Sequence, residues 1–343
     1  MFRLNLRLFD ADNTHVMPIN TTTDTTATTG NDLSPEMRTY YTKQLLENCR
    51  PDLVFSQFSK KEPIPTHGGK TIQFRRLSKI APPSAALTEG VTPAGTKLNV
   101  VEVTATVAQY GQYVALSDVL QTSAIDPMLE ATLKELGATA GEHLDALTRD
   151  VVVGGTRALF AGGRSARSAL TATDKITMDL IYDAARVLKR NDIPKINGEY
   201  ICVIHPDVAK DLKRTTDWQE FVKYQRPEKI YEGDIGSIDG IRFIETSHAK
   251  HWTATEAGTT NVPVYATVVF GANAYAETEI SGLGLDVIVK QLGSGGTEDP
   301  LNQRATVGWK ATHVAKRLDE LSIIRIESAV SSSTDGVVVT AAN

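Results

Sequence analysis

The sequence contains few cysteines. Only Cys49 and Cys202 occur in 343 residues, and they lie far apart along the chain. Two cysteines are too few for a disulfide framework, and they show no metal-ligand spacing. The cysteine content therefore excludes a disulfide-rich secreted scaffold and fits a reducing compartment.

An excess of positive charge is also absent. The chain has 36 basic and 41 acidic residues, which gives a net charge of −5. The densest basic clusters are adjacent pairs, at Arg75–Arg76, Lys213–Arg214 and Lys316–Arg317. Domains that recognise nucleic acid usually carry a basic excess or a basic stripe. The charge pattern therefore argues against sequence-specific binding to DNA or RNA.

Long apolar runs are missing as well. No stretch approaches the length needed to cross a bilayer. The first residues, MFRLNLRLFDADNTH, alternate apolar and polar side chains and place Arg3, Arg7 and Asp10 where a signal peptide needs an unbroken apolar core. We expect neither a membrane span nor secretion by that route.

What the chain does have is an ordinary globular composition. Hydrophobic residues make up 41% and charged residues 22%. A chain of 343 residues is long enough for about two domains, each with a sizeable core.

The most informative segment is a pair of strand-like runs, Lys70–Leu77 and Leu98–Leu116. The connection between them has no helical or strand period and holds several prolines and glycines, among them Pro82, Pro93 and Gly90. A structureless connection of this length is unusual inside a compact domain. It is typical of a hairpin arm that leaves its own domain. Because an isolated two-stranded hairpin is marginal in water, the arm predicts a neighbour, most simply another copy of the chain.

Residues 1–33 are predicted to form an N-terminal arm. Apolar residues alternate at Phe2–Leu8, and the tract Thr21–Thr29 is polar and of low complexity. Both a tether on a neighbouring subunit and a flexible terminus fit this composition. Ser34, Pro35 and Glu36 then form a helix start, and Pro51 ends that helix.

The longest predicted helix opens at Asp126–Pro127 and ends near Gly154–Gly155. One face is apolar, with residues three or four positions apart. These are Leu129, Leu133, Leu136, Ala140, Leu144, Leu147 and Val151. The opposite face is charged, and we place Asp145 and Arg149 on it.

The second half of the chain predicts a compact α+β unit at about 173–292. A helix at 177–190, a buried strand at Tyr200–Ile204 and a helix starting at His205-Pro206 follow one another. Further strands are predicted at 241–245, 265–270, 306–316 and 321–327.

No catalytic, cofactor-binding or metal residue is predicted. The sequence has no nucleophile elbow, phosphate loop, zinc-protease helix or calcium loop. Glu245, His248 and His251 would share a helix face and could hold a metal, but nearby Gly258 and Pro263 favour loop residues. We therefore predict that the protein is not an enzyme.

Carboxylates close together can do acid–base chemistry, and the sequence has two adjacent acidic pairs, Glu298-Asp299 and Asp319-Glu320. No histidine or pocket signature accompanies them. Salt bridges with Arg304 or Arg317 are the better interpretation.

Taken in order, several segments resemble one family over nearly the whole chain. They are LRLFDAD at 6–12, LSPEMRTYY at 33–41, PIPTHGGKTIQF at 63–74, LTEGVTPAGTKLNVVEVTAT at 87–106, LTRDVVVGG at 147–155 and DPLNQRATVGWK at 299–310. This set resembles the major capsid protein of tailed double-stranded DNA bacteriophages, in the subgroup related to coliphage N-four.

The resemblance implies an α+β fold of the Hong Kong 97 type. Its expected parts are an N-terminal arm at 1–33, a helix and lead-in at 34–67, an extended hairpin loop at 68–117, a peripheral domain at 118–172 with a spine helix at 126–154, an axial domain at 173–292, return strands to the peripheral domain at 293–327 and a C-terminal tail at 328–343. Some phages of this fold join subunits through a lysine–asparagine bond. Lys70, Lys97 and Asn302 are the residues to consider, but no cross-link is predicted.

The resemblance further implies a virion protein that assembles with copies of itself, as hexamers and pentamers, into an icosahedral head around phage DNA. Portal, scaffold and decoration proteins would be its other partners. It would bind DNA without sequence specificity, touch no membrane and assemble in the host cytoplasm. The alternatives are an encapsulin-like nanocompartment shell, a monomeric hydrolase or phage adhesin, and another virion part such as a tail or decoration protein.

Overall fold

The computed structural model describes residues 19–20, 31–32, 53–65, 67–77, 80, 82, 86–87, 89–90, 92, 95–123, 128–225, 236–259, 262–281, 284–292, 299 and 301–331. The chain divides into two compact units, and each is described by itself. Unit 1 comprises Met1–Leu53, Ala108–Leu144 and Ile280–His313. Unit 2 comprises Val54–Val107, Asp145–Glu279 and Val314–Asn343. No helix of the described part is long and apolar enough to cross a membrane.

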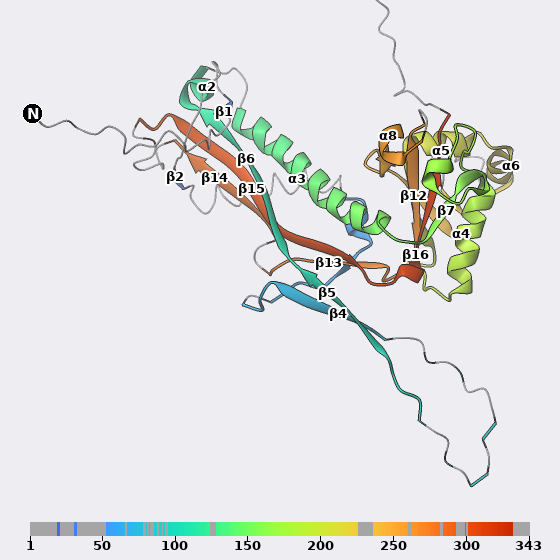
Figure 1. Ribbon diagram of the computed structural model, residues 1–343. Coiled ribbons are helices and arrows are strands. Elements are labelled where there is room, and N and C mark those ends of the chain that lie inside the picture. Colours follow the sequence, from blue (N-terminus) through green and yellow to red (C-terminus); the bar gives the residue numbers. More distant parts are fainter. Residues whose placement is uncertain are drawn as a thin grey trace, which may run out of the picture. The chain divides into compact units, whose positions relative to one another are not determined.

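Unit 1 is a sheet with a long helix on one face (Figure 1). The strand order is β1 (Ile19–Asn20), β6 (Ala108–Ser117), β15 (Arg304–Arg317), β14 (Leu285–Gln291) and β2 (Asn31–Asp32). β15 lies antiparallel to both of its neighbours, whereas β1 lies parallel to β6. Residues up to His313 of β15 belong to this unit. The short helix α2 (Asp118–Ser123) follows β6 directly.

The long helix α3 (Met128–Val153) agrees with the predicted spine helix at 126–154. Its apolar residues face the sheet because they recur at helical spacing. Leu133 and Ala140 are fully buried there, against Val307 and Trp309 of β15. Burying one such leucine stabilises the unit by about 2 kcal/mol. The alternation of β14, with Val287 inward and its neighbours outward, supplies the other half of this core.

Unit 2 is built around a second sheet. The strand order is β7 (Ala158–Phe160), β16 (Ile323–Ser328), β12 (Val264–Phe270), β8 (Tyr200–Ile204), β10 (Ile241–Glu245) and β9 (Ser237–Ile238), and β11 (His251–Trp252) also pairs with β12. The helices are α4 (Met178–Arg190), α5 (Pro206–Lys213), α6 (Thr216–Gln225) and α8 (Ala254–Ala257), with short 3-10 turns η4 (Ala161–Gly163), η5 (Arg167–Ala169) and η7 (Glu320–Ser322).

Both faces of this sheet are buried, because its central strands are apolar at successive positions. Every residue of β8 and β12 is buried. Along β8, Cys202 and Ile204 face one cluster together with α4 and α5, whereas Ile201 and Val203 face a second cluster. Continuous apolar runs of this kind are typical of strands covered on both sides. Burial also raises the pKa of the Cys202 thiol, so that this cysteine is a core residue and not a reactive one.

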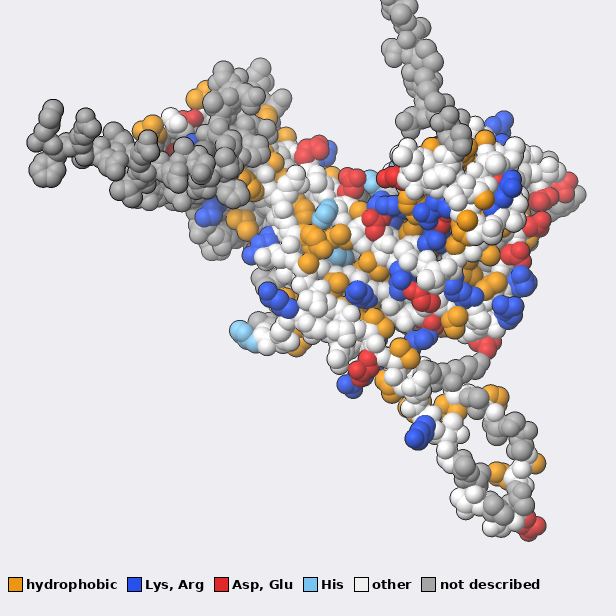
Figure 2. All heavy atoms as spheres, viewed as in Figure 1, with side chains coloured by type: hydrophobic (Ala, Val, Ile, Leu, Met, Phe, Trp, Pro, Cys, Tyr) orange, Lys and Arg blue, Asp and Glu red, His pale blue; other side chains and the backbone are white. Residues whose placement is uncertain are grey.

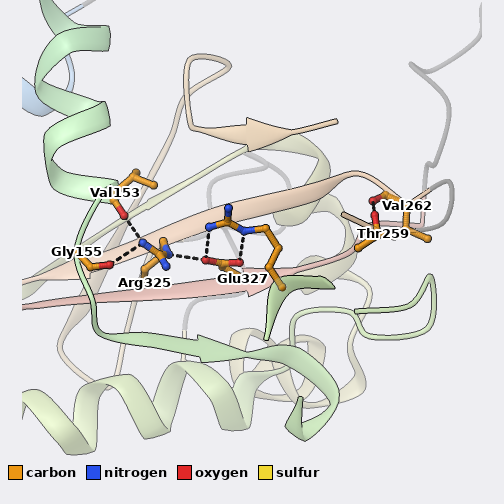
Figure 3. Close-up of polar contacts among 7 residues, drawn as sticks. Val153, Gly155, Thr259, Val262, Arg325 and Glu327 are labelled. Carbon is orange, nitrogen blue, oxygen red and sulfur yellow. Dashed lines mark hydrogen bonds and ion pairs between the residues drawn. The ribbon is translucent and has the colours of Figure 1, made fainter. Parts of the chain in front are cut away.

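A buried ion-pair network joins β16 to its surroundings (Figure 3). Glu327 is fully buried and accepts hydrogen bonds from Arg325, at 2.6 Å, and from both Nε and Nη2 of Arg167. Arg325 also donates to the main-chain carbonyls of Val153 and Gly155, at the end of α3. These carbonyls have no partner within the helix, so the guanidinium of Arg325 caps the C-terminal end of α3.

A two-stranded ribbon also belongs to unit 2. β4 (Thr71–Leu77) pairs antiparallel with β5 (Val100–Thr106). Near its base, β13 (Tyr275–Thr278) lies between Val314–Arg317 of β15 and β3 (Lys60–Lys61). The 3-10 turn η3 (Phe55–Gln57) precedes β3.

Three predicted boundaries differ from the structure. The run Leu98–Leu116 divides at Val107, since β5 pairs within the hairpin and β6 pairs with β15. β14 lies in the sheet of unit 1, not in the expected axial unit at 173–292. β16 lies inside the unit 2 sheet, between β7 and β12, rather than returning to the other unit, because five of its six residues are buried and need cover on both faces.

Other expectations lie wholly or mostly outside the described residues. They are the N-terminal arm at 1–33 apart from β1 and β2, the helix starting at Ser34–Glu36, and the tail beyond Ser331.

Candidate assembly surfaces

The hairpin of β4 and β5 has one face that packs on unit 2 and one that does not. The register runs from Thr71 opposite Thr106 to Leu77 opposite Val100. Because side chains alternate along a strand, Phe74 and Ala105 share the inner face, where they are almost fully buried.

The base of the hairpin is fixed by apolar packing and by one ion pair. Phe74 and Ala105 pack against Ala276 of β13, with Leu318 at the edge. Arg76 on the inner face pairs with Asp319 at 2.5 Å. Both anchors lie in the first part of the ribbon. The rest of the hairpin therefore gains little stabilisation from contacts with its own unit.

Beyond that base, the hairpin carries apolar side chains in solvent (Figure 2). Leu77 is 61% exposed and Leu87 is 77% exposed. Ile80, Leu98 and Val100 are exposed as well. A group of exposed apolar residues on one projecting segment marks an interaction surface, since single exposed residues are common but clusters are not.

A strap at Phe55–Lys61 leads into the hairpin and is held by two buried carboxylates. Asp145 Oδ1 accepts the amide hydrogens of Phe55, at 2.8 Å, and Ser56, at 3.2 Å. Glu277 accepts the hydroxyl hydrogens of Ser56, Thr148 and Ser59, at 2.6–2.9 Å.

Among the residues that the structure describes, this carboxylate pair has neutral donors but no cation. Asp145 is 1% exposed, and its Oδ2 atom has no hydrogen-bond partner. Burial, together with the nearby charge of Glu277, raises the pKa of Asp145 to about 6, although the amides of Ser56 and Phe55 oppose this rise. The strap therefore depends on a group that titrates close to neutral pH.

The face of the unit 1 sheet opposite α3 has an open hollow of about 430 Å³. Tyr113 of β6, Gly308 of β15 and Ile288 of β14 lie in one row across three strands. Tyr113 is 43% exposed and Ile288 is 40% exposed.

The residues considered for metal binding do not come together as a site. Glu245 pairs with Lys213 at 2.5 Å, and His251 lies in β11 with its ring against Tyr265. Within the described ranges, no group of three or more histidine, cysteine or acidic side chains could hold a metal ion.

The structure describes three of the four residues in the two acidic pairs, namely Asp299, Asp319 and Glu320. Arg317 pairs with Glu320 at 2.5 Å, which confirms one of the expected salt bridges. Asp319 pairs with Arg76 of the hairpin instead. Asp299 is buried, and its neighbour Glu298 lies outside the described residues.

The prediction for Asp145 was wrong, since this residue is buried and not on the solvated face of α3. Asp145, Thr148 and Val152 are spaced by three and four, so they share a helix face, and all three are buried. That spacing, which joins two small polar residues to an apolar one, is the signal that could have revealed a buried polar stripe.

Comparison with solved structures identifies the class of fold. The chain is similar to the capsid of Ralstonia phage GP4, with a TM-score of 0.62 and 14% identity over 80% of this chain and 87% of that one. The capsid of cyanophage P-SCSP1u gives 0.60 and 16%, with the same coverage of 80% and 87%. The capsid of cyanophage Pam1 gives 0.61 and 15%, with coverage of 77% and 86%. The fold is the Hong Kong 97 type found in phage capsids.

The sequence itself then identifies the family. The model of the family described as phage capsid protein matches residues 100–326, which is more than half of the 343 residues. A comparison with curated proteins found no match. The chain belongs to the phage capsid protein family, and it is a major capsid protein that forms the shell of the head.

Proposed function

We propose that copies of this chain associate as hexamers and pentamers, which tile an icosahedral head around double-stranded phage DNA. The protein acts structurally and catalyses no reaction. The net charge of −5 fits a shell that does not bind the phosphates of the enclosed DNA tightly. In this proposal the shell assembles in the host cytoplasm, and a portal protein occupies one vertex.

In this proposal the parts of the chain take the roles expected of the fold. Residues 1–33 are the N-terminal arm and 71–106 the extended hairpin. Unit 1 with α3 corresponds to the peripheral domain, and the sheet of unit 2 with α4 and α5 to the axial domain. Each subunit lays its hairpin over a neighbour and so covers apolar surface that its own unit leaves in solvent.

The observation that supports this proposal most strongly is the exposed apolar part of the hairpin. Each large apolar side chain that becomes buried contributes about 1.5–3 kcal/mol before ordering costs are subtracted. Repetition over many identical contacts then makes a weak contact sufficient for a stable shell.

Deletion of Ser78–Thr96 tests the role of the hairpin. Because Leu77 pairs with Val100, the deletion leaves Lys97, Leu98 and Asn99 as a three-residue turn between paired strands. The variant should keep the circular dichroism and the melting temperature of the unassembled subunit, and it should fail to form closed shells in electron micrographs.

The control replaces the same segment by a glycine–serine linker of equal length. This variant keeps the reach of the loop but removes its apolar side chains, so it should also fail to close. Normal heads from either variant would contradict the proposed role.

A further inference from the structure

The turn that precedes β8 is a tight hairpin built from Asn197 and Gly198. Ile196 and Glu199 exchange both main-chain hydrogen bonds, at 2.9 and 3.0 Å, and so close the turn. Both central residues have positive φ, +50° at Asn197 and +90° at Gly198. This is the geometry of a type I′ turn, for which the dipeptide Asn-Gly is strongly preferred. Asn197-Gly198 is the only Asn-Gly pair in the sequence.

The two groups of this turn that could react with each other are both free. Asn197 and Gly198 are exposed. Neither the side-chain amide of Asn197 nor the main-chain amide of Gly198 has a hydrogen-bond partner among the residues that the structure describes. A Cβ built on Gly198 would meet no atom within 4 Å. The side chain of Asn197 can therefore approach the next main-chain nitrogen without displacing a neighbour.

The turn between β9 and β10 has the same shape but is restrained. Asp239 and Gly240 also have positive φ, at +50° and +74°. The carboxylate of Asp239 pairs with Lys189 at 2.6 Å. Lys195 lies over the turn, since a Cβ on Gly240 would be 2.8 Å from its Nζ. In the described part of the chain Asn197 has no such partner, so only the turn before β8 leaves its side chain unrestrained.

We propose that Asn197 is a self-modification site, at which the main-chain nitrogen of Gly198 attacks Cγ of the Asn197 side chain. The new bond joins that nitrogen to Cγ, the bond from Cγ to Nδ2 breaks, and ammonia leaves with the proton of the Gly198 amide. Water then opens the cyclic imide at either carbonyl, which gives aspartate or isoaspartate. The chain itself is consumed, and water is the one further reactant. This inference goes beyond the shell-forming function and does not depend on it.

The two products differ in their effect on the turn. Aspartate at position 197 keeps the length of the main chain, and aspartate tolerates positive φ. Isoaspartate lengthens the main chain by an extra carbon, so Ile196 and Glu199 can no longer keep both hydrogen bonds. The next residue, Tyr200, begins β8 and donates to the carbonyl oxygen of Ile193 at 3.0 Å. The isoaspartate form should therefore loosen the start of an interior strand of unit 2.

Ageing of the purified full-length protein tests this reaction. The protein is held at mildly alkaline pH and physiological temperature, digested at mildly acidic pH, and analysed by peptide mass mapping against an unaged sample. The tryptic peptide Ile196–Lys210 contains Asn197 as its only asparagine. It should gain the mass of an amide-to-acid exchange, and fragmentation should show isoaspartate beside aspartate.

Asn302 is the matched control within the chain. It is exposed and has a φ of +54°, but the next residue is Gln303, whose side chain hinders attack by its main-chain nitrogen. Asn197 should convert at least about tenfold faster than Asn302, which corresponds to about 1.4 kcal/mol in activation free energy. The variant Asn197→Asp starts with the aspartate product alone, so aged wild-type protein should unfold at a lower urea concentration than this variant.

Three results would overturn the inference. The first is conversion at Asn197 that is no faster than at Asn302. The second is a product that contains aspartate but no isoaspartate, since direct hydrolysis forms no imide. The third is conversion in urea-unfolded protein but not in native protein, which would show that the closed turn prevents the attack. None of these results bears on shell formation, which electron microscopy of the same sample reports separately.

Discussion

Replacing Asp145 by asparagine should change how the stability of the subunit depends on pH. The amide keeps an oxygen that can accept the hydrogens of Phe55 and Ser56, but it carries no charge. The substitution therefore separates the charge of this buried group from its hydrogen bonds.

The expected magnitude follows from the pKa. Folding raises the pKa of Asp145 from 3.8 to about 6. The folded state therefore binds the proton more tightly than the unfolded state. The free energy of unfolding should rise as pH falls from about 7 to about 4, by up to ~3 kcal/mol at 1.36 kcal/mol per pKa unit. In the asparagine variant this contribution is absent, and at neutral pH the variant should be at least as stable as the wild type.

Urea unfolding of the unassembled subunit at a series of pH values measures this effect. The quantity to plot is the difference in free energy of unfolding between variant and wild type, because other titrating groups cancel in it. Glu135→Gln, at an exposed position of α3, changes the net charge equally and should leave the difference flat.

Two results would refute the reasoning. One is a difference that does not vary between pH 4 and pH 7. The other is a loss of more than about 2 kcal/mol in the asparagine variant at pH 7.5, which is the size expected when a hydrogen bond to a needed charge is removed.

Two further substitutions test unit 2. Glu327→Gln should destabilise the protein by about 3–5 kcal/mol, because it leaves the guanidinium groups of Arg167 and Arg325 without their buried counter-charge, and thermal unfolding measures the loss. Gly162→Ala should destabilise it by at least about 1–3 kcal/mol, since φ is +64° there and the new Cβ would lie 2.1 Å from Oδ1 of Asp174.

Each of these has a control within the chain. Gly163→Ala shares the positive φ but meets no atom within 4 Å, so it isolates the backbone strain from the collision. Equal losses at the two glycines would show that Asp174 is irrelevant. For the ion pairs, Arg186→Gln removes an exposed partner and should cost less than about 1 kcal/mol.

Local periodicity was enough to predict most elements of the fold. The helical spacing of α3 and the apolar run of β8 each specify one element without reference to the rest of the chain. β14 and β16 were assigned to the wrong units, because strand partners are set by contacts distant in sequence. A strand pattern shows which face is apolar but not which sheet covers it.

The candidate surfaces were predictable only in part. The hairpin was visible because prolines and glycines interrupt the pattern between two strand-like runs. The hollow was not, since it depends on the register that sets Gly308 between Tyr113 and Ile288. The buried position of Asp145 depends on a strap about ninety residues away along the chain. The periodicity of the helix does not indicate a contact with that strap.

The position of β16 inside the sheet also constrains when the protein can fold. This strand lies between β12 and β7, and its Glu327 binds Arg167, 160 positions earlier. While the ribosome is still making residues before Ile323, unit 2 lacks an interior strand, and β12 and β7 each have an unpaired edge. Pairings so distant in sequence form slowly. Unit 2 is therefore incomplete until β16 has left the ribosome, and before that point a nascent chain has no finished unit 2 surface to offer a growing particle.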